Sequence, residues 1–248
     1  MLSKKLKSLG KLFDRCDKVF GVNVFGTSEV NDYKFEHSVN ILRDFLDNDG
    51  DGKADSKKLV KSLKREKAVL TIFSDEDQLE EFIDKHESKF EKAKANFQDL
   101  LDHEIITPLD ESNRFDASLE EVFHLISDYG YSEVYPRQLG RNKDSLIGRL
   151  MNNARGGYFR KVPNEYPEDA YFTYDDKSCD YECQITEYFY WGMTSVLGAQ
   201  KSPERLSEIQ GEWKLNTPSK VAEGDPELFG LLTNEKFSLP TVLPDGLI

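Results

Sequence analysis

The fold of this chain is decided by residues 33–63, which read YKFEHSVNILRDFLDNDGDGKADSKKLVKSL. Apolar residues recur at helical spacing from about Tyr33 to Leu46, and again from about Ser56 onward. The segment between them, residues 47–55, is acidic and contains two glycines, which favours a turn rather than a continuous helix. The stretch therefore predicts two helices joined by a tight loop.

The loop between these predicted helices places oxygen-bearing side chains at alternate positions. Calcium takes six to eight oxygens at about 2.3–2.6 Å, and twelve-residue loops supply them at such spacing, with a glycine at position six. Gly52 falls at position six when the count starts at Asp47. The sequence predicts a calcium site whose ligands are Asp47, Asp49, Asp51, the carbonyl of Lys53, and Asp55. The alternative is an exposed acidic turn that binds nothing.

This segment resembles the calcium loops of EF-hand and dockerin proteins over about 25 residues. It departs from the EF-hand pattern at position twelve, where Lys58 replaces a bidentate Glu. Sensor proteins pair two such loops and use calcium to open a helix pair. A lone loop without the terminal Glu therefore predicts a structural site, or weak affinity of the extracellular kind.

The whole chain is predicted to be mainly α, with about eight or nine helices, little β structure and long ordered loops. Val22–Gly26 alternates briefly, as a short strand or an extended entry into the next helix would. Further helices are expected at roughly residues 2–20, 75–104, 118–129, 144–155 and 181–197. No linker is visible, which predicts a single domain over residues 1–248. Its N-terminal part, 1–105, would carry the calcium loop, and its C-terminal part, 106–248, a second candidate site.

That second site rests on residues 118–126, which read SLEEVFHLI. The segment resembles the zincin helix HExxH, with Glu120 in place of the first His. The resemblance implies Glu120 and His124 as metal ligands and Glu121 as the general base that activates a water. The metal would be Zn²⁺ or another divalent transition metal. Two alternatives are an i,i+3 ligand pair of Glu121 and His124, and a capping box of Ser118 with Glu121 that needs no metal.

Two further residues are candidate ligands of the same metal. Glu187 lies in a helix that is apolar nearly all round, and a buried carboxylate is costly unless it is paired, protonated or metal-bound. Gluzincins take their third ligand from a downstream Glu, and the resemblance implies Glu187 for that role; a salt bridge to Arg155 or Arg149 is the alternative. His37, in the helix before the calcium loop, is either a fourth ligand or a surface histidine.

Composition limits the classes of partner. The net charge of −13 argues against nucleic acid, because phosphate binding needs a basic face. No apolar run reaches the ~20 residues of a transmembrane helix. The N-terminal residues lack the apolar region of a signal peptide, but the character of the calcium loop favours an extracellular or secreted protein.

Three cysteines are present, and two of them, Cys179 and Cys183, are four residues apart. A short-range disulfide fits a secreted protein, and two buried thiols fit the sequence equally well. The run from His37 through the calcium loop, with residues 179–183 and 187–191, resembles a group of uncharacterised proteins and implies no activity.

The sequence supports two hypotheses of function. The first is a calcium-binding globular protein with a second His/Glu metal site that supports hydrolysis by a metal-activated water. The second is a non-catalytic, calcium-stabilised binding or matrix-interaction protein. In both, metal ions are the expected ligands.

Overall fold

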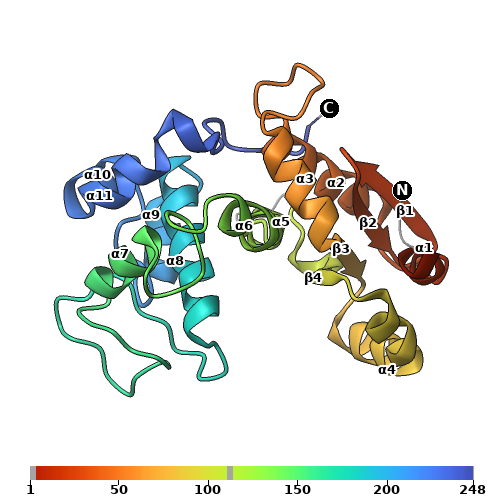
Figure 1. The fold of residues 1–248 in the computed structure, drawn as a ribbon, viewed down its shortest axis with the longest axis horizontal. Helices are drawn as coiled ribbons and strands as arrows, with labels where there is room; N and C mark the ends of the chain where they lie inside the picture. Colours follow the sequence, from red (N-terminus) through yellow and green to blue (C-terminus); the bar gives the residue numbers. More distant parts are fainter. Residues whose placement is uncertain (1–3, 111–113, 248) are drawn as a thin grey trace. The chain divides into compact units, whose positions relative to one another are not determined.

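The computed structural model describes residues 4–110 and 114–247 of the chain (Figure 1). The chain folds into two compact units. The first contains Met1–Gly130 together with the C-terminal segment Pro244–Ile248, and the second contains Tyr131–Leu243. Compact units are not necessarily separate domains, so the single domain over residues 1–248 stays a prediction.

The first unit is built on a four-stranded mixed sheet. The prediction of a mainly α fold with little β structure is therefore wrong, and the chain is α/β. The strands lie side by side in the order β1 (Arg15–Val19), β2 (Val22–Gly26), β3 (Ala68–Phe73) and β4 (Asn96–Leu101). β1 runs antiparallel to β2, whereas β2, β3 and β4 are parallel, with Leu70 lying between Val24 and Gln98.

There are physical reasons why the apolar periodicity of the sequence did not predict strands β1, β3 and β4. β3 reads AVLTIF and is buried at every position, as expected of a parallel strand covered on both faces. β1 and β4 occupy stretches predicted to be helical, 2–20 and 75–104. The helix within 75–104 ends at Ala93, because Lys94 adopts a left-handed conformation with φ of 47°. The short strand predicted at Val22–Gly26 is confirmed.

Helices cover both faces of this sheet. They are α1 (Lys4–Gly10), α2 (Asp32–Leu46), α3 (Lys57–Glu66), α4 (Glu76–Ala93) and α5 (Ser118–Ile126). α1 and α4 pack on the face that presents Phe25, Val69 and Phe73. α2, α3 and α5 pack on the opposite face, where Phe35 of α2 lies against Gly26.

The two parallel connections of the sheet have opposite handedness. The β2–β3 connection carries α2 and α3, the β3–β4 connection carries α4, and both step the same way across the sheet. Their helices lie on opposite faces, so one of the two crossovers is left-handed (Figure 1). Only about 2% of such connections are left-handed. The predicted calcium loop lies in the first of these connections, between α2 and α3.

The C-terminal segment returns to the first unit and packs on α2. Asn40 Nδ2 donates to the Gly246 carbonyl at 3.2 Å, and Gly246 N donates to Asp44 Oδ2 at 3.1 Å. Gly246 has φ of 68°, and a Cβ at this position would lie 2.2 Å from His37 Nδ1. Only glycine meets both the conformational and the steric demand.

The second unit is helical and is organised around one buried helix. Its helices are α6 (Ser132–Val134), α7 (Leu146–Ala154), α8 (Tyr181–Val196), α9 (Pro203–Ile209), α10 (Pro218–Gly224) and α11 (Pro226–Leu232). α7, α10 and α11 pack against α8. A disulfide joins Cys179 to Cys183 at the start of α8, which resolves the two alternatives for these cysteines. Short 3-10 helices cover Asp102–Glu104 and Glu235–Phe237, and a π-helical turn covers Ser127–Tyr131.

A buried carboxylate, Asp225, links three parts of the second unit. Its Oδ2 accepts hydrogen bonds from the hydroxyls of Tyr171, at 2.8 Å, and Tyr188. Its Oδ1 accepts from Leu228 N at 3.0 Å and so caps the N-terminus of α11. Burial raises the pKa of both tyrosines, and the Asp225 carboxylate adds to the effect. Asp225 therefore connects the 171 loop, α8 and α11.

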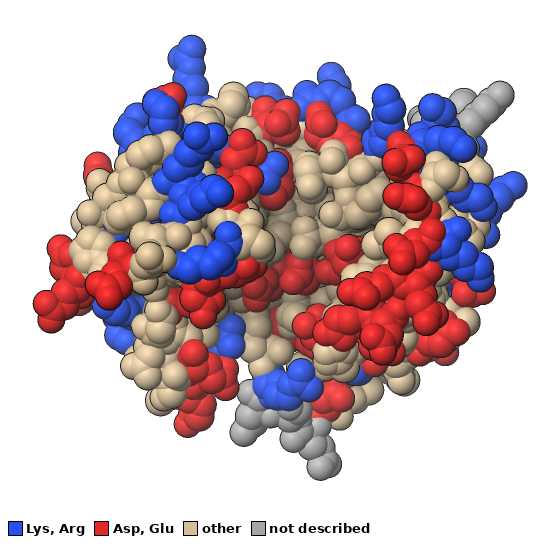
Figure 2. Space-filling view, turned by 90° about the horizontal axis from the view of Figure 1, so that it is seen from below, with Lys and Arg blue, Asp and Glu red and all other residues tan. Residues whose placement is uncertain are grey.

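The surface of the protein reflects its composition. Figure 2 shows broad patches of acidic side chains on the face in view, in agreement with 46 Asp and Glu residues against 33 Lys and Arg. Such a surface favours cations over polyanions as partners. Within residues 4–110 and 114–247, every helix is too short or too polar to span a bilayer.

Candidate metal sites

The predicted calcium loop lies between two helices, as the sequence indicated. α2 ends at Leu46 and α3 begins at Lys57. The Ser56 hydroxyl accepts from Leu59 N at 3.3 Å and caps α3, which sets the point where the chain leaves the loop. Asp55 N donates to the Leu46 carbonyl at 2.9 Å, so the two ends of the loop are held together.

The first residue of the loop organises its turn. The Asp47 carboxylate is buried and accepts from Asp51 N at 3.1 Å and from Gly52 N at 2.9 Å. Gly50 and Gly52 have φ of 69° and 82°, values that β-carbon-bearing residues rarely adopt. The glycine at position six thus serves the sharp turn expected of it.

Three of the predicted ligands converge in the loop. One carboxylate oxygen from each of Asp47, Asp49 and Asp55 lies within 4.8 Å of the others. Two oxygens bound to one calcium are at most about 5.2 Å apart, twice the longest usual Ca–O distance. The spacing of these oxygens therefore fits a single calcium ion.

Asp51 is oriented differently from the other three aspartates. Its carboxylate accepts from Lys53 N at 2.8 Å and pairs with the Lys53 ammonium at 2.7 Å. Both side chains are exposed, so this ion pair is weak and an ion could displace it. Lys58, at position twelve, is exposed and offers no carboxylate. The roles of Asp51 and the Lys53 carbonyl as ligands stay predictions.

Electrostatics in the loop favour a cation. Burial raises the pKa of the Asp55 carboxyl, and the carboxylates of Asp49, Asp47 and Asp51 raise it further, while a hydrogen bond from Asn48 N lowers it. A raised carboxyl pKa means that the negative charge is unfavourable in the metal-free loop. A bound calcium ion would relieve that cost.

The helix predicted at residues 118–129 is present as α5, and it carries the second candidate site. An oxygen of Glu120 and a ring nitrogen of His124 lie within 4.8 Å of each other, as the i,i+4 spacing implies. The capping box of Ser118 with Glu121 is not formed. Instead, Ser118 Oγ donates to Asp116 Oδ2 at 2.6 Å, and Glu121 accepts from Gln98 of β4.

Glu121 and His124 have pKa values displaced in opposite directions. Burial raises the pKa of Glu121 to about 8, and the nearby Glu120 carboxylate adds to the effect. Burial lowers the pKa of His124 to about 4. His124 Nδ1 lies 3.8 Å from Glu121 Oε2. A neutral imidazole is the form that binds a metal, and a carboxylate of raised pKa is a stronger base, so both shifts suit the predicted roles.

These shifts make stability depend on pH in the metal-free protein. Glu121 favours folding below its unfolded pKa of 4.5, and this stability is lost as pH rises through 8. His124 favours folding above 6.5, and this stability is lost as pH falls through 4. Glu121→Gln should remove the alkaline loss and His124→Gln the acid loss, up to about 5 and about 3 kcal/mol, because one pKa unit corresponds to about 1.4 kcal/mol. Urea unfolding at pH values from 4 to 9 gives the free energy of unfolding as a function of pH. If a variant keeps the pH dependence of the wild type, the assignment of that residue is contradicted.

The other two predicted ligands are found in different settings. His37 is buried, and its Nε2 lies 2.7 Å from Asp116 Oδ2. Glu187 is buried on α8 of the second unit. The structure thus brings Glu120 and His124 together within one unit and engages one nitrogen of His37 with a carboxylate. The complete set of four ligands stays a prediction.

Sequence reasoning missed Asp116, which holds several groups of this region in place. Its Oδ1 accepts from Ile106 N and Ser118 N, both at 3.1 Å, while its Oδ2 binds Ser118 and His37. The available signal was an aspartate two residues before Ser118, a spacing typical of side-chain capping of a turn. The partnership with His37, 79 residues away, leaves no local signal.

Comparisons with known proteins identify no relative of this chain. No protein-family model matches the chain, and no curated protein or solved structure is significantly similar to it. The resemblances to EF-hand and dockerin loops and to the zincin helix therefore rest on short motifs alone.

Proposed function

We propose that this protein binds one calcium ion in the loop of residues 47–58, where the ion stabilises the α2–loop–α3 connection. The observation that carries the proposal is the convergence of carboxylate oxygens from Asp47, Asp49 and Asp55 within 4.8 Å. The buried Asp47 carboxylate and the raised pKa of Asp55 support it. With Lys58 at position twelve, the role is structural rather than sensory.

Calcium titration by calorimetry tests this proposal. The wild type should bind about one calcium per chain, with a Kd in the range of extracellular modules, about 10⁻⁴–10⁻³ M. Asp49→Asn should weaken binding by at least about tenfold. Asp84→Asn, an exposed aspartate of α4, is the matched control and should bind as the wild type does. Absence of saturable binding by the wild type would refute the proposal.

A second candidate function is metal-dependent hydrolysis centred on α5. It is favoured by the Glu120–His124 pair and by the raised pKa of Glu121, which would act as the base. Glu187 and His37 are the proposed additional ligands. Zn²⁺ or another divalent transition metal would supply the Lewis acid that activates a water. The non-catalytic alternative, a calcium-stabilised binding or matrix-interaction protein, requires no such metal.

Metal analysis of the purified protein separates these alternatives. Near-stoichiometric zinc or another transition metal, lost in His124→Gln but retained in His86→Gln, would support the second site. His86 is the control because it lies on α4, which packs on the opposite face of the sheet from α5. If calcium is the only metal found in the purified protein, the hydrolase hypothesis is excluded. The hypothesis of a non-catalytic, calcium-stabilised binding protein then remains. The Cys179–Cys183 disulfide supports a location outside the cytosol, where such bonds persist.

A further inference from the structure

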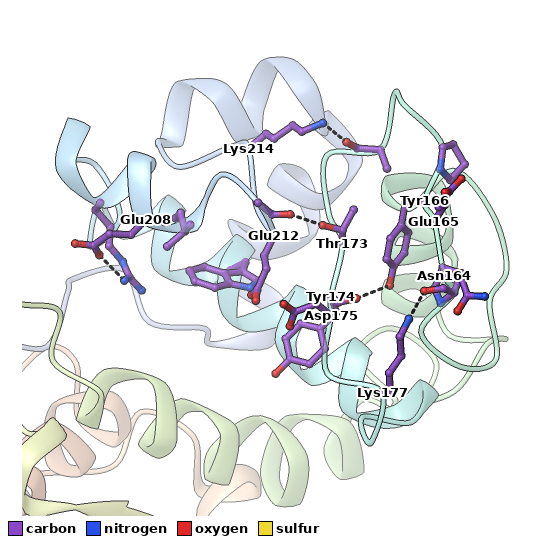
Figure 3. Close-up of a pocket in the computed structure, with 17 residues that line it drawn as sticks. Asn164, Glu165, Tyr166, Thr173, Tyr174, Asp175, Lys177, Glu208, Glu212 and Lys214 are labelled. Atoms are coloured by element: carbon purple, nitrogen blue, oxygen red, sulfur yellow. Dashed lines mark hydrogen bonds and ion pairs between the residues drawn. The ribbon is translucent and has the colours of Figure 1, made fainter.

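The second unit contains a cavity of about 750 Å³ that the calcium and metal hypotheses do not use. It lies between the 163–177 loop on one side, and α9 with residues 211–214 on the other (Figure 3). Trp191 of α8 contributes to its lining. Ligand sites usually measure about 300–1,000 Å³, so this cavity has room for a small organic molecule.

The basic side chains of the lining are already engaged. The ammonium groups of Lys177 and Lys214 each donate to a main-chain carbonyl at 2.5 Å (Figure 3). Arg205 pairs with Glu208 at 2.9 Å. A phosphate or carboxylate ligand would have to displace these bonds, so the cavity is poorly suited to anions.

Two acidic side chains of the lining have no such partners. The carboxylates of Glu212 and Asp175 make no hydrogen bond or ion pair within residues 4–110 and 114–247, and Figure 3 draws them close to each other. Burial raises the pKa of Glu212, and the charge of Asp175 raises it further, while the charge of Arg205 lowers it. These two groups are therefore acceptors that a ligand with O–H or N–H groups could satisfy.

The lining also contains a buried tryptophan. Trp191 is only 5% exposed, and its indole Nε1 has no hydrogen-bond partner in the described part of the chain. Buried N–H groups of tryptophan usually find an acceptor, because an unpaired buried donor costs about 1–3 kcal/mol. The Arg205 guanidinium lies 5.6 Å from the centre of the indole ring and fixes its position.

Aromatic rings provide the apolar part of the wall. Tyr166 and Tyr174 are both half-buried in the lining, and the Tyr166 hydroxyl donates to the Tyr174 carbonyl at 3.3 Å. Ring faces held in this way can pack against the C–H groups of a ligand.

A ligand for this cavity must donate to Glu212 and Asp175 and offer C–H groups to the tyrosines. A hydroxyl group is both donor and acceptor, and a pyranose carries several hydroxyls around a ring with C–H faces. A simple ammonium ion offers no C–H face to the tyrosine rings, and an anion would have to displace the bonds that the basic side chains already make. We propose that this cavity binds a neutral saccharide of one or two rings.

The test uses the full chain and a panel of neutral sugars: glucose, galactose, mannose, N-acetylglucosamine, cellobiose, maltose, lactose and chitobiose. Trp191 and Trp213 are the two tryptophans of the chain, and Trp191 lines the cavity, so tryptophan fluorescence reports binding. At least one sugar should quench or shift the emission saturably, with a Kd of about 1 mM. Calorimetry on the same sugar should give the same affinity.

Variants assign the binding to this cavity. Glu212→Gln, nearly isosteric, should weaken binding at least about tenfold while leaving the melting temperature close to wild type. Trp191→Phe should remove the fluorescence response and weaken binding measured by calorimetry. Glu168→Gln, an exposed acid of the same loop region, should bind as the wild type does.

Three results would overturn the proposal. One is the absence of saturable binding by every sugar of the panel at about 50 mM, far above the expected Kd. Another is binding that Glu212→Gln leaves unchanged. The third is saturable binding of butylammonium, lost in Glu212→Gln, with no sugar bound; the cavity would then be a site for organic cations.

Discussion

Asp47→Ala is expected to abolish the rise in melting temperature that calcium produces in the wild-type protein. A ligand present at 100 times its Kd stabilises the folded state by about 2.7 kcal/mol, which corresponds to several degrees in a chain of this size. Asp47 contributes one of the three convergent oxygens, and its carboxylate also holds Asp51 N and Gly52 N. Its removal therefore takes away a ligand and the order of the turn together.

Differential scanning calorimetry with and without excess calcium measures this effect. Asp84→Asn controls for the loss of one negative charge, and it should keep the full rise. Magnesium should produce a smaller rise than calcium, because Mg²⁺ demands octahedral geometry at about 2.0–2.1 Å and gives up its waters reluctantly. An Asp47→Ala protein that still gains stability with calcium would place the ion elsewhere.

Asp225→Ala should destabilise the second unit by about 3–7 kcal/mol. The change removes the cap of α11, worth about 1 kcal/mol, and leaves the buried hydroxyls of Tyr171 and Tyr188 without their acceptor, at about 1–3 kcal/mol each. Asp225→Asn keeps an oxygen acceptor of the same size and should cost less.

The two tryptophans make this loss measurable within the second unit. Both lie in residues 131–243, so the emission change in urea follows the unfolding of that unit. Adding Tyr171→Phe to Asp225→Ala should recover part of the lost stability, because it removes one of the unpaired hydroxyls. A cost below about 1 kcal/mol for Asp225→Ala would show that water replaces the carboxylate.

The helix–loop–helix of residues 33–63 could be predicted because its signals are local. The apolar periodicity of α2, the glycines of the loop and Ser56 as the cap of α3 all act within a few residues. The sheet could not be predicted in the same way. β3 and β4 pair with strands far away in the sequence, and β4, NFQDLL, follows α4 so closely that its residues extended the helical pattern.

The same distinction between local and distant contacts applies to the candidate sites. The convergence of Asp47, Asp49 and Asp55 follows from spacing within one loop. The prediction of a capping box at Ser118 was wrong because the Ser118 hydroxyl donates to Asp116 and not to the main chain of α5. Glu121 accepts a hydrogen bond from Gln98 instead, and this contact depends on how α5 packs on β4. The cavity of the second unit is invisible to periodicity, because its lining comes from loops whose conformation is set by contacts such as Thr173 N to the Glu212 carbonyl.

The return of Gly246 to α2 has a consequence for how the protein is made. The second unit, residues 131–243, is an insertion between two pieces of the first. A ribosome releases the chain from its N-terminus, so α2 emerges long before the segment that covers His37, Asn40 and Asp44. The first unit therefore cannot complete its packing until translation has passed the whole insertion, whereas the second can close around α8 earlier.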